Sequence, residues 1–238
     1  MNVQEATTRR LPDLKERHLP ENCRETINTI LKETYGYEQF RNLEIYDDLS
    51  KGKEKLCISQ GQLIENVILE AEKAWKSETQ VDNILLTAPT GSGKSLLFQL
   101  PAIYLGKEYN LLTIVVSPLK ALIVDQVESL QELGYTRVAY ASSDLSPEQK
   151  MEVYRQVREG EIDLFYLSPE LLLSYDIKHF VGERRIGLVV VDEAHTVTTW
   201  GKEFRVDYWF LGRYLNTLKQ TLGYNFPLFA LTATAVWN

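Results

Sequence analysis

Residues 86–95, LTAPTGSGKS, constrain the fold more than any other part of this chain. They follow the apolar run NILLT and precede the helical pattern SLLFQL, which is the context that a phosphate-binding loop requires. Gly91 and Gly93 allow the backbone to curl, so that successive N–H groups point at phosphate oxygens. Lys94 can bring positive charge to the outer phosphates, and the Ser95 hydroxyl is a candidate magnesium ligand. We therefore expect a nucleotide-binding α/β domain.

Apolar runs and helical patterns alternate after residue 80. The strand candidates are 83–88, 112–117, 137–141, 163–167, 187–192 and 228–232, and the helix candidates between them are 95–105, 120–133 and 146–160. Runs such as IVV and LVVV are apolar on both faces, which is typical of central parallel strands covered by helices. The pattern predicts a mostly parallel central sheet flanked by helices.

The first 80 residues differ in texture from the rest. They are charged and mostly helical in pattern, with Ile27, Ile30 and Leu31 on one helical face and the apolar residues of 61–78 on another. The KGKEK cluster between these two helices indicates an exposed turn. We expect residues 1–80 to form a helical N-terminal segment and residues 81–238 to form the nucleotide-binding domain.

Composition excludes several classes of protein. With 44% hydrophobic and 25% charged residues among 238, the chain can bury a sizeable core. A net charge of −7 argues against a surface coated with basic patches, although it leaves a local nucleic-acid groove open. Cys23 and Cys57 cannot make a four-cysteine zinc site, and we expect them to be reduced thiols. The sequence has no apolar run of the ~18 residues that span a bilayer, so the expected location is cytoplasmic, or nuclear in a eukaryote.

The segment VVVDEAH, residues 189–195, supplies the acidic partner of the loop. Asp192 at the end of a buried strand can hold magnesium beside the phosphates, usually through water. Glu193 can orient and deprotonate an attacking water molecule. A lone acidic pair at a strand end is more often part of a solvated loop, but its position after a phosphate loop in an α/β chain favours the catalytic interpretation.

Together, PTGSGKS and DEAH resemble the superfamily 2 helicases, and the remaining motifs resemble the RecQ family. YGYEQFR (35–41) is similar to its adenine-recognition motif, SPLKALIVDQ (117–126) to motif Ia, LSPE (167–170) to motif Ib and LTATA (231–235) to motif III. HTVTTWGKEFRVDY (195–208) is similar to the aromatic-rich loop of RecQ proteins. The resemblance spans residues 26 to 235 and implies a RecA-like P-loop NTPase domain that uses ATP and Mg²⁺.

The resemblance also implies roles for individual residues around the nucleotide. Tyr37 would stack on adenine with Arg41 beside it, and the phosphates would meet the loop residues Thr90, Gly91, Ser92, Gly93, Lys94 and Ser95. The chain has Glu44 where the family has the glutamine that recognises adenine. Gln62, beyond an insertion, is the replacement that we favour, and Gln60 is the second possibility. Taken alone, an aromatic residue such as Tyr37 is more often part of a core.

On the nucleic-acid side, the resemblance implies contacts with single-stranded DNA or with a duplex that has a single-stranded tail. The expected DNA-binding residues are Ser117, Lys120, Ser168, Trp200, Lys202, Phe204 and Arg205. Aromatic rings stack on bases without reading sequence, and hydroxyls and cations bind phosphates. The alternatives are that the aromatic residues pack in the core and that the Ser-Pro dipeptides cap helices.

The family pattern includes a second RecA-like domain that follows motif III and completes the ATP site. We therefore expect this chain to be the first motor domain of a longer helicase that couples ATP hydrolysis to translocation and unwinding, in the 3′–5′ direction. Alone, it is expected to bind ATP weakly and to hydrolyse it slowly. The alternative is an ATP-responsive DNA-binding or interaction module of a larger defence or repair complex, without unwinding activity.

Overall fold

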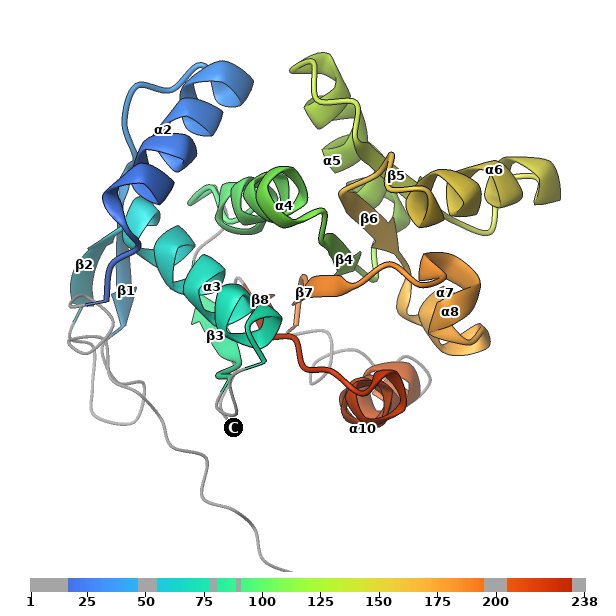
Figure 1. Cartoon of the computed structure of the whole chain (residues 1–238). Helices are drawn as coiled ribbons and strands as arrows, with labels where there is room; N and C mark the ends of the chain where they lie inside the picture. The colour runs from blue at the N-terminus through green and yellow to red at the C-terminus, as the bar shows by residue number, and fades with distance from the viewer. Residues whose placement is uncertain (1–16, 47–54, 78–80, 89–90, 195–204, 233–238) are drawn as a thin grey trace, which may run out of the picture.

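The computed structural model describes residues 17–46, 55–77, 81–88, 91–194 and 205–232 (Figure 1). Within these ranges, six parallel strands form one sheet in the order β3-β8-β7-β4-β6-β5. Their bounds are β3 Ile84–Thr87, β4 Leu112–Val116, β5 Val138–Ala141, β6 Leu164–Leu167, β7 Ile186–Val191 and β8 Leu228–Thr232. Each strand lies within a residue or so of a run that the sequence predicts, so the parallel α/β sheet is confirmed.

Strand β7 shows how the sheet divides the core in two. All six of its residues are buried, and successive side chains point to opposite faces of the sheet. Leu188 and Val190 enter one hydrophobic cluster, whereas Val189 and Val191 enter the other. The continuous apolar run LVVV thus serves both layers at once.

The first layer holds four helices that share one core. They are α2 (Glu21–Tyr35), α3 (Gln60–Trp75), α4 (Leu96–Tyr109) and α5 (Lys120–Glu132). Residues 96–106 of α4 are buried without a gap, because α4 packs against the sheet, α2 and α3. The expected apolar face of α2, with Ile27, Ile30 and Leu31, is buried in this core. The N-terminal segment therefore packs on the sheet, and the boundary at residue 80 stays a prediction.

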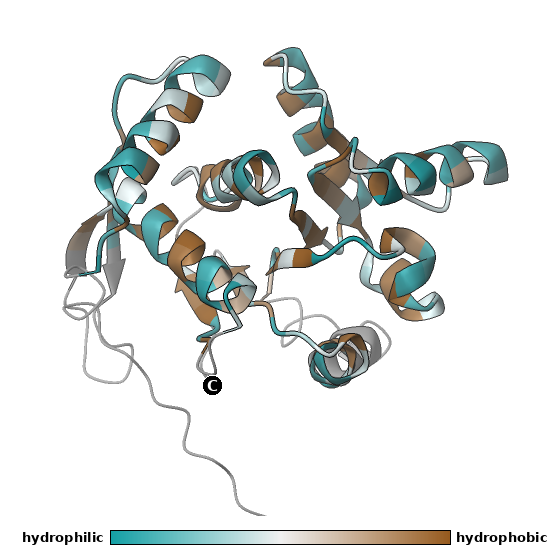
Figure 2. Cartoon of the chain, in the orientation of Figure 1, coloured by the Kyte–Doolittle hydropathy of each residue, from teal (hydrophilic) through white to brown (hydrophobic). Residues whose placement is uncertain are grey.

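The second layer covers the opposite face with α6 (Pro147–Arg158), α7 (Pro169–Ser174), α8 (Ile177–Val181) and α10 (Arg205–Leu222). Helix α6 begins at a capping box, in which the Ser146 hydroxyl accepts from the Gln149 backbone N–H and the Gln149 side chain accepts from the Ser146 N–H. Only Tyr154 and Val157 of α6 are buried, and Figure 2 shows this helix mainly hydrophilic while the strands are mainly hydrophobic. An amphipathic surface helix of this kind stabilises the sheet through one face.

A β-hairpin occupies the place where the sequence pattern indicates only an exposed turn. Strands β1 (Asn42–Tyr46) and β2 (Lys55–Ser59) pair antiparallel, so the segment expected to be mostly helical also contains two strands. Leu43 lies directly opposite Ile58, and both side chains are buried in the first core. This cross-strand apolar pair explains why the segment forms strands despite its charged neighbours.

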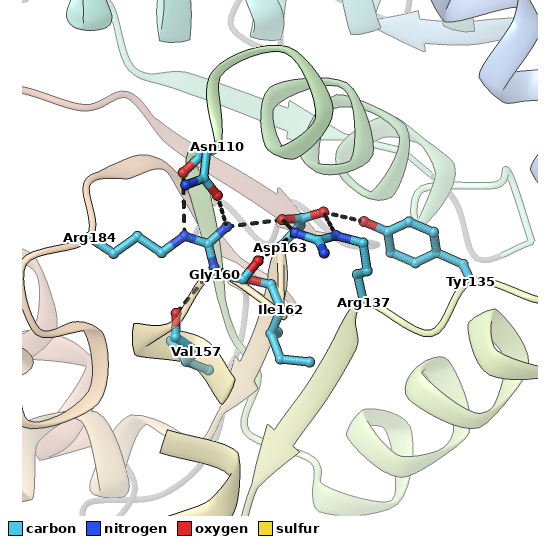
Figure 3. Close-up of polar contacts among 8 residues, drawn as sticks. All are labelled: Asn110, Tyr135, Arg137, Val157, Gly160, Ile162, Asp163 and Arg184. Atoms are coloured by element: carbon cyan, nitrogen blue, oxygen red, sulfur yellow. Dashed lines mark hydrogen bonds and ion pairs between the residues drawn. The ribbon is translucent and has the colours of Figure 1, made fainter. Parts of the chain in front are cut away.

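The amino-terminal ends of the central strands are tied together by charged side chains (Figure 3). Asp163, before β6, accepts hydrogen bonds from Arg137 (2.6 and 2.9 Å), from Arg184 (2.9 Å) and from the Tyr135 hydroxyl (2.9 Å). Arg184, before β7, also donates to the carbonyls of Val157, Ile162 and Asn110 and to the Asn110 side chain. The network joins segments that precede β4, β5, β6 and β7, so it fixes their register at the edge away from the phosphate loop.

Both cysteines are free, as the sequence predicts: Cys23 is half-buried and Cys57 is exposed. Among the described residues, no helix combines the length and apolar character needed to cross a membrane.

Candidate nucleotide and nucleic-acid site

The residues singled out by motif gather at one edge of the sheet, the carboxyl ends of the strands. The phosphate loop follows β3, Ser117 follows β4, Ser168 follows β6 and Asp192 follows β7. In an open parallel sheet this edge is where ligands bind, because the strand-to-helix turns there are free to shape a site. The fold therefore places the phosphate loop, Ser117, Ser168 and Asp192 on one side of the molecule.

The phosphate loop has the backbone that its glycines permit. Gly91 and Gly93 have φ angles of 80° and 78°, which a residue with a Cβ rarely adopts. Lys94 Nζ donates to the Ala88 carbonyl at 3.0 Å, and so closes the loop on itself. The Ser92 hydroxyl is buried and has no hydrogen-bond partner among the described residues. Thr90 lies outside the described residues.

Gln60 braces this loop from the first residue of α3. Its side-chain Nε2 donates to the Ser92 carbonyl at 3.2 Å, and its Oε1 accepts from the Arg41 backbone N–H at 3.2 Å. A Cβ on Gly93 would lie 2.8 Å from Gln60 Nε2, so the glycine also makes room for the brace. Gln60 is 3% exposed, and its amide joins Arg41, in the segment predicted to recognise adenine, to the phosphate loop.

Gln62, the glutamine that the sequence favours for adenine recognition, lies elsewhere on α3. Its Nε2 donates to the Arg17 carbonyl at 2.8 Å. The structure thus brings Gln60 against the phosphate loop and turns Gln62 toward the segment that precedes α2. The order along α3 explains the difference, because residues two apart on a helix do not share a face.

Tyr37 and Arg41 lie together beside this brace. The Tyr37 ring is 47% exposed and stacks on the Tyr35 ring, with centroids 6.4 Å apart and planes 13° from parallel. The Arg41 guanidinium lies 5.8 Å from the Tyr37 ring centroid. An exposed ring backed by a second ring, with a cation nearby, is suited to stacking on a flat base.

The acidic turn after β7 is held by both neighbouring strands. The Asp192 backbone N–H donates to the Val116 carbonyl at 2.9 Å, and the Ala194 N–H donates to the Leu231 carbonyl at 2.8 Å. Glu193 has a φ of 51°, an uncommon left-handed conformation for a residue with a side chain. Its backbone N–H donates to Asp192 Oδ1 at 2.9 Å. Local strain of this kind clusters at functional sites.

Electrostatics link the turn to the loop. Burial, and next the adjacent Glu193 carboxylate, raise the pKa of Asp192 above its usual range, while hydrogen bonds and the Lys94 ammonium act in the opposite direction. Asp192 is 5% exposed. A buried carboxylate whose ionised form is disfavoured gains most from a nearby cation.

The residues present fit a nucleotide with a magnesium ion. The two left-handed glycines, and the buried Ser92 hydroxyl without a partner in the described part of the chain, offer polar groups to phosphate oxygens. The Asp192 carboxylate and the Ser95 hydroxyl are the hard oxygen donors that Mg²⁺ prefers. Ser95 itself makes no capping hydrogen bond at the start of α4.

The predicted DNA-binding residues with described side chains fall into different environments. Ser117 is 1% exposed, and its hydroxyl has no partner among the described residues. Lys120 is exposed and forms an ion pair with Asp144. The Ser168 hydroxyl accepts from the Leu171 backbone N–H at 3.3 Å, so it caps α7, the alternative that the Ser-Pro pattern left open.

The aromatic-rich segment lies mostly outside the described residues. Trp200, Lys202 and Phe204 fall in the range 195–204, which the structure does not describe. Arg205 is the first residue of α10, so the segment expected to be loop is helical from this residue onward.

Sequence reasoning passed over Gln126, which the structure brings to the acidic turn. Gln126 lies on α5 at the end of SPLKALIVDQ, and its Nε2 donates to Asp192 Oδ2 at 3.4 Å. In the sequence, only its place at the end of SPLKALIVDQ pointed to a role for Gln126, because the residue that it contacts lies 66 positions away.

Comparison with known proteins agrees with this fold. A family model described as DEAD/DEAH box helicase matches residues 69–238. The ATP-dependent DNA helicase RecQ of Haemophilus influenzae is 30% identical over 210 residues, which cover 88% of this chain and 28% of the relative. The RecQ protein of Synechocystis is 34% identical over 217 residues, 89% of this chain and 38% of the relative.

The chain thus spans between 28% and 38% of the length of these two relatives. Among solved structures, the DUF1998 helicase MrfA bound to DNA matches 92% of this chain and 28% of that chain, with a TM-score of 0.61 at 20% identity. That likeness supports the RecA-like fold alone. The match of the family model over most of the chain, on a fold with the expected loop and acidic turn, shows that the chain belongs to the DEAD/DEAH box helicase family.

Proposed function

We propose that this chain is the ATP-hydrolysing first motor domain of a RecQ-like DNA helicase. The observation that carries the proposal is the placement of the loop and the acidic turn at one edge of the sheet. The loop with Lys94 follows β3 and the turn with the buried Asp192 follows β7, at the carboxyl ends of the strands. A cation and a carboxylate at the carboxyl edge of a parallel sheet are the two halves of a nucleotide-hydrolysing centre.

In this proposal the phosphates lie in the loop formed by Thr90, Gly91, Ser92, Gly93 and Lys94. Tyr37 stacks on the adenine ring and Arg41 lies beside it. Gln62 exchanges its hydrogen bond with the Arg17 carbonyl for one with the adenine edge, which an amide side chain can meet as donor and acceptor.

Ser95 and Asp192 hold the magnesium ion, directly or through water. When bound, Mg²⁺ neutralises charge on the outer phosphates. Glu193 is the base that orients and deprotonates the attacking water. Its left-handed backbone supports this role, because the chain maintains an unfavourable conformation at that residue.

We place the second wall of the ATP site in a further RecA-like domain of the full-length protein. An arginine supplied across such a cleft can raise the hydrolysis rate by roughly 10³–10⁵. The name of the RecQ relatives, and their length, support this part of the proposal.

The DNA strand would cross the same edge of the sheet. The proposed contacts are Ser117, Lys120, Ser168, Trp200, Lys202, Phe204 and Arg205, with 3′–5′ polarity as in the resemblance. The buried Ser117 hydroxyl, which has no partner in the described ranges, supports a ligand near the end of β4. Base stacking on rings such as Trp200 contributes about 1–3 kcal/mol per base.

Hydrolysis by the full-length protein, with and without single-stranded DNA, tests the proposal. We expect DNA to stimulate the wild type, Trp200→Ala to lose the stimulation, and Glu193→Gln to lose hydrolysis while still binding ATP. Normal hydrolysis by Glu193→Gln would refute the assigned base. DNA-stimulated hydrolysis without strand displacement would identify an ATP-responsive DNA-binding module instead of a helicase.

A further inference from the structure

Five polar side chains form an unbroken chain of hydrogen bonds through the first core. The Tyr35 hydroxyl donates to Gln99 Oε1 at 3.2 Å, and Gln99 Nε2 donates to the Tyr166 hydroxyl at 3.2 Å. The Tyr166 hydroxyl donates to Gln126 Oε1 at 3.0 Å, and Gln126 Nε2 donates to Asp192 Oδ2 at 3.4 Å. We refer to these five residues as the buried relay.

The buried relay lies where water cannot easily replace its bonds. Tyr166 is 0% exposed, Asp192 5% and Gln99 6%, while Tyr35 and Gln126 are half-buried. A polar group buried without a partner is strongly unfavourable. Loss of one link therefore leaves its neighbours unsatisfied instead of solvated, and the links act together.

The polarity of the relay follows from the charge at its end. An ionised carboxylate only accepts, so Gln126 must turn its Nε2 toward Asp192 and its carbonyl toward Tyr166. The Tyr166 hydroxyl must then donate to that carbonyl, which leaves its oxygen to accept from Gln99. Gln99 in turn presents its carbonyl to Tyr35. Every donor thus points toward Asp192.

The two ends of the relay touch the two ends of the proposed nucleotide site. The Tyr35 ring stacks on Tyr37, the ring proposed to meet adenine. At the other end, Asp192 Oδ2 accepts from Gln126 and Oδ1 accepts from the Glu193 backbone N–H. Within the described part of the chain, each carboxylate oxygen therefore has one protein donor, and its remaining lone pair would be available to a metal-bound water.

We propose that Gln126 and Tyr166 are positioning residues that fix the Asp192 carboxylate for the magnesium–nucleotide complex. The inference rests on the proposed role of Asp192 as a magnesium ligand. Gln126 belongs to α5, which begins at Lys120 in the segment proposed to meet DNA. A shift of this helix would move the donor on Asp192, so the same residue links the two proposed ligand sites.

The test measures binding of a fluorescent ATP analogue to the whole 238-residue chain, with Mg²⁺ and with a chelator in its place. Tyr166→Phe removes only the hydroxyl, and Gln126→Ala removes the amide. In chelator, we expect each variant to bind the analogue as tightly as the wild type does. The factor by which Mg²⁺ raises the affinity should be about tenfold smaller in each variant than in the wild type, as for the loss of a hydrogen bond to a charged group. Because both changes break the same chain, the double variant should lose no more than either single one.

Two variants serve as matched controls for size and place. Tyr154→Phe removes a hydroxyl from a tyrosine buried in the second core, and Gln131→Ala truncates an exposed glutamine of α5. Both are expected to keep the full effect of Mg²⁺. Equal weakening of Tyr166→Phe in chelator and in Mg²⁺ would show an effect on the fold alone and would overturn the proposal.

Lys94→Ala separates failure of the relay from failure of the proposed function. If the wild type gains nothing from Mg²⁺, or binds the analogue no better than Lys94→Ala, the nucleotide site itself is wrongly assigned. If the wild type gains from Mg²⁺ and Lys94→Ala does not, but Tyr166→Phe and Gln126→Ala keep the full gain, the relay does not position Asp192. Additive losses in the double variant would also overturn it.

Discussion

The side-chain amide of Gln60 donates to the carbonyl of Ser92 across 3.2 Å and so attaches α3 to the phosphate loop. Gln62, two residues later, donates to the Arg17 carbonyl instead. Gln60→Ala removes the bond to Ser92 and the one from the Arg41 backbone N–H. We expect it to weaken the binding of ATP and of GTP equally, by about three- to tenfold. Gln62→Ala should weaken the binding of ATP and leave the binding of GTP unchanged. Titration of each variant with both fluorescent nucleotides checks this, and an ATP-selective loss in Gln60→Ala would exchange the two roles.

The left-handed backbone at Glu193 predicts a difference in stability between two variants of this residue. Glycine adopts a φ of 51° without strain, whereas alanine does not. Glu193→Gly should therefore be more stable than Glu193→Ala by about 1 kcal/mol, while both variants lose hydrolysis. Thermal unfolding of the two variants gives the difference directly. Equal midpoints would mean that residue 193 is not strained in solution.

The buried pair of Asp163 and Arg184 should dominate the stability of the sheet. Their side chains are 3% and 4% exposed, so Asp163→Asn leaves a buried guanidinium without its counter-ion. We expect a loss of about 3–5 kcal/mol in the free energy of unfolding, measured by urea denaturation. Arg155→Ala removes more ion pairs, with Glu152, Glu159 and Glu161, but these are exposed, and we expect no measurable change.

Gly106 makes the approach of α4 to this network possible. A Cβ at that position would lie 2.3 Å from Asp163 Cγ, and the ion pairs of Asp163 prevent it from moving away. Gly106→Ala should therefore destabilise the protein despite the better helix propensity of alanine. Gly212→Ala, in α10 with no atom within 4 Å of the added Cβ, should be neutral or stabilising by up to about 1 kcal/mol. Comparison of the two melting temperatures tests whether close packing or propensity decides.

The lowered pKa of Glu70 predicts part of the loss of stability in acid. Burial opposes its ionisation, but hydrogen bonds from the Asp82 N–H, Arg17 and Lys73 outweigh this and hold the pKa of Glu70 below the usual 4.5. As pH falls below 4.5, the unfolded chain therefore takes up the proton first, and the free energy of unfolding decreases.

Glu70→Gln should flatten this decrease when urea unfolding is followed between about pH 6 and pH 3. Gln131→Ala, a change at an exposed residue of α5 that does not ionise, should keep the wild-type slope. An unchanged slope in Glu70→Gln would mean that other carboxylates account for the acid sensitivity.

The sheet and the phosphate loop could be predicted because their signals are local. An apolar run such as LVVV by itself indicates a strand buried on both faces, and the glycines of the loop by themselves indicate a backbone with positive φ angles. The order of runs and helices then leaves few ways to connect a parallel sheet. The helix candidate 146–160 likewise located the start of α6, which begins at Pro147 with Ser146 as its cap.

The polar contacts of the interior could not be predicted in the same way. The bonds that join Tyr35, Gln99, Tyr166, Gln126 and Asp192 connect residues between 40 and 67 positions apart. The residues next to a glutamine in the sequence do not indicate which distant hydroxyl it will bond to. The hairpin of β1 and β2 was missed for another reason: the charges near its turn dominate the composition, while its core contribution depends on Leu43 and Ile58.

That hairpin has a practical consequence for engineering. At its base the Gln60 N–H donates to the Arg41 carbonyl at 2.9 Å, and pairing continues from Asn42 with Ser59 to Tyr46 with Lys55. The hydrogen-bonded pairs of β1 and β2 set the spacing of Arg41 and Gln60. This spacing therefore does not depend on the length of the chain between Tyr46 and Lys55. The closure entropy of a longer connection grows only slowly with length. A fluorescent reporter or affinity tag grafted between Tyr46 and Lys55 should therefore leave the geometry of the nucleotide site unchanged.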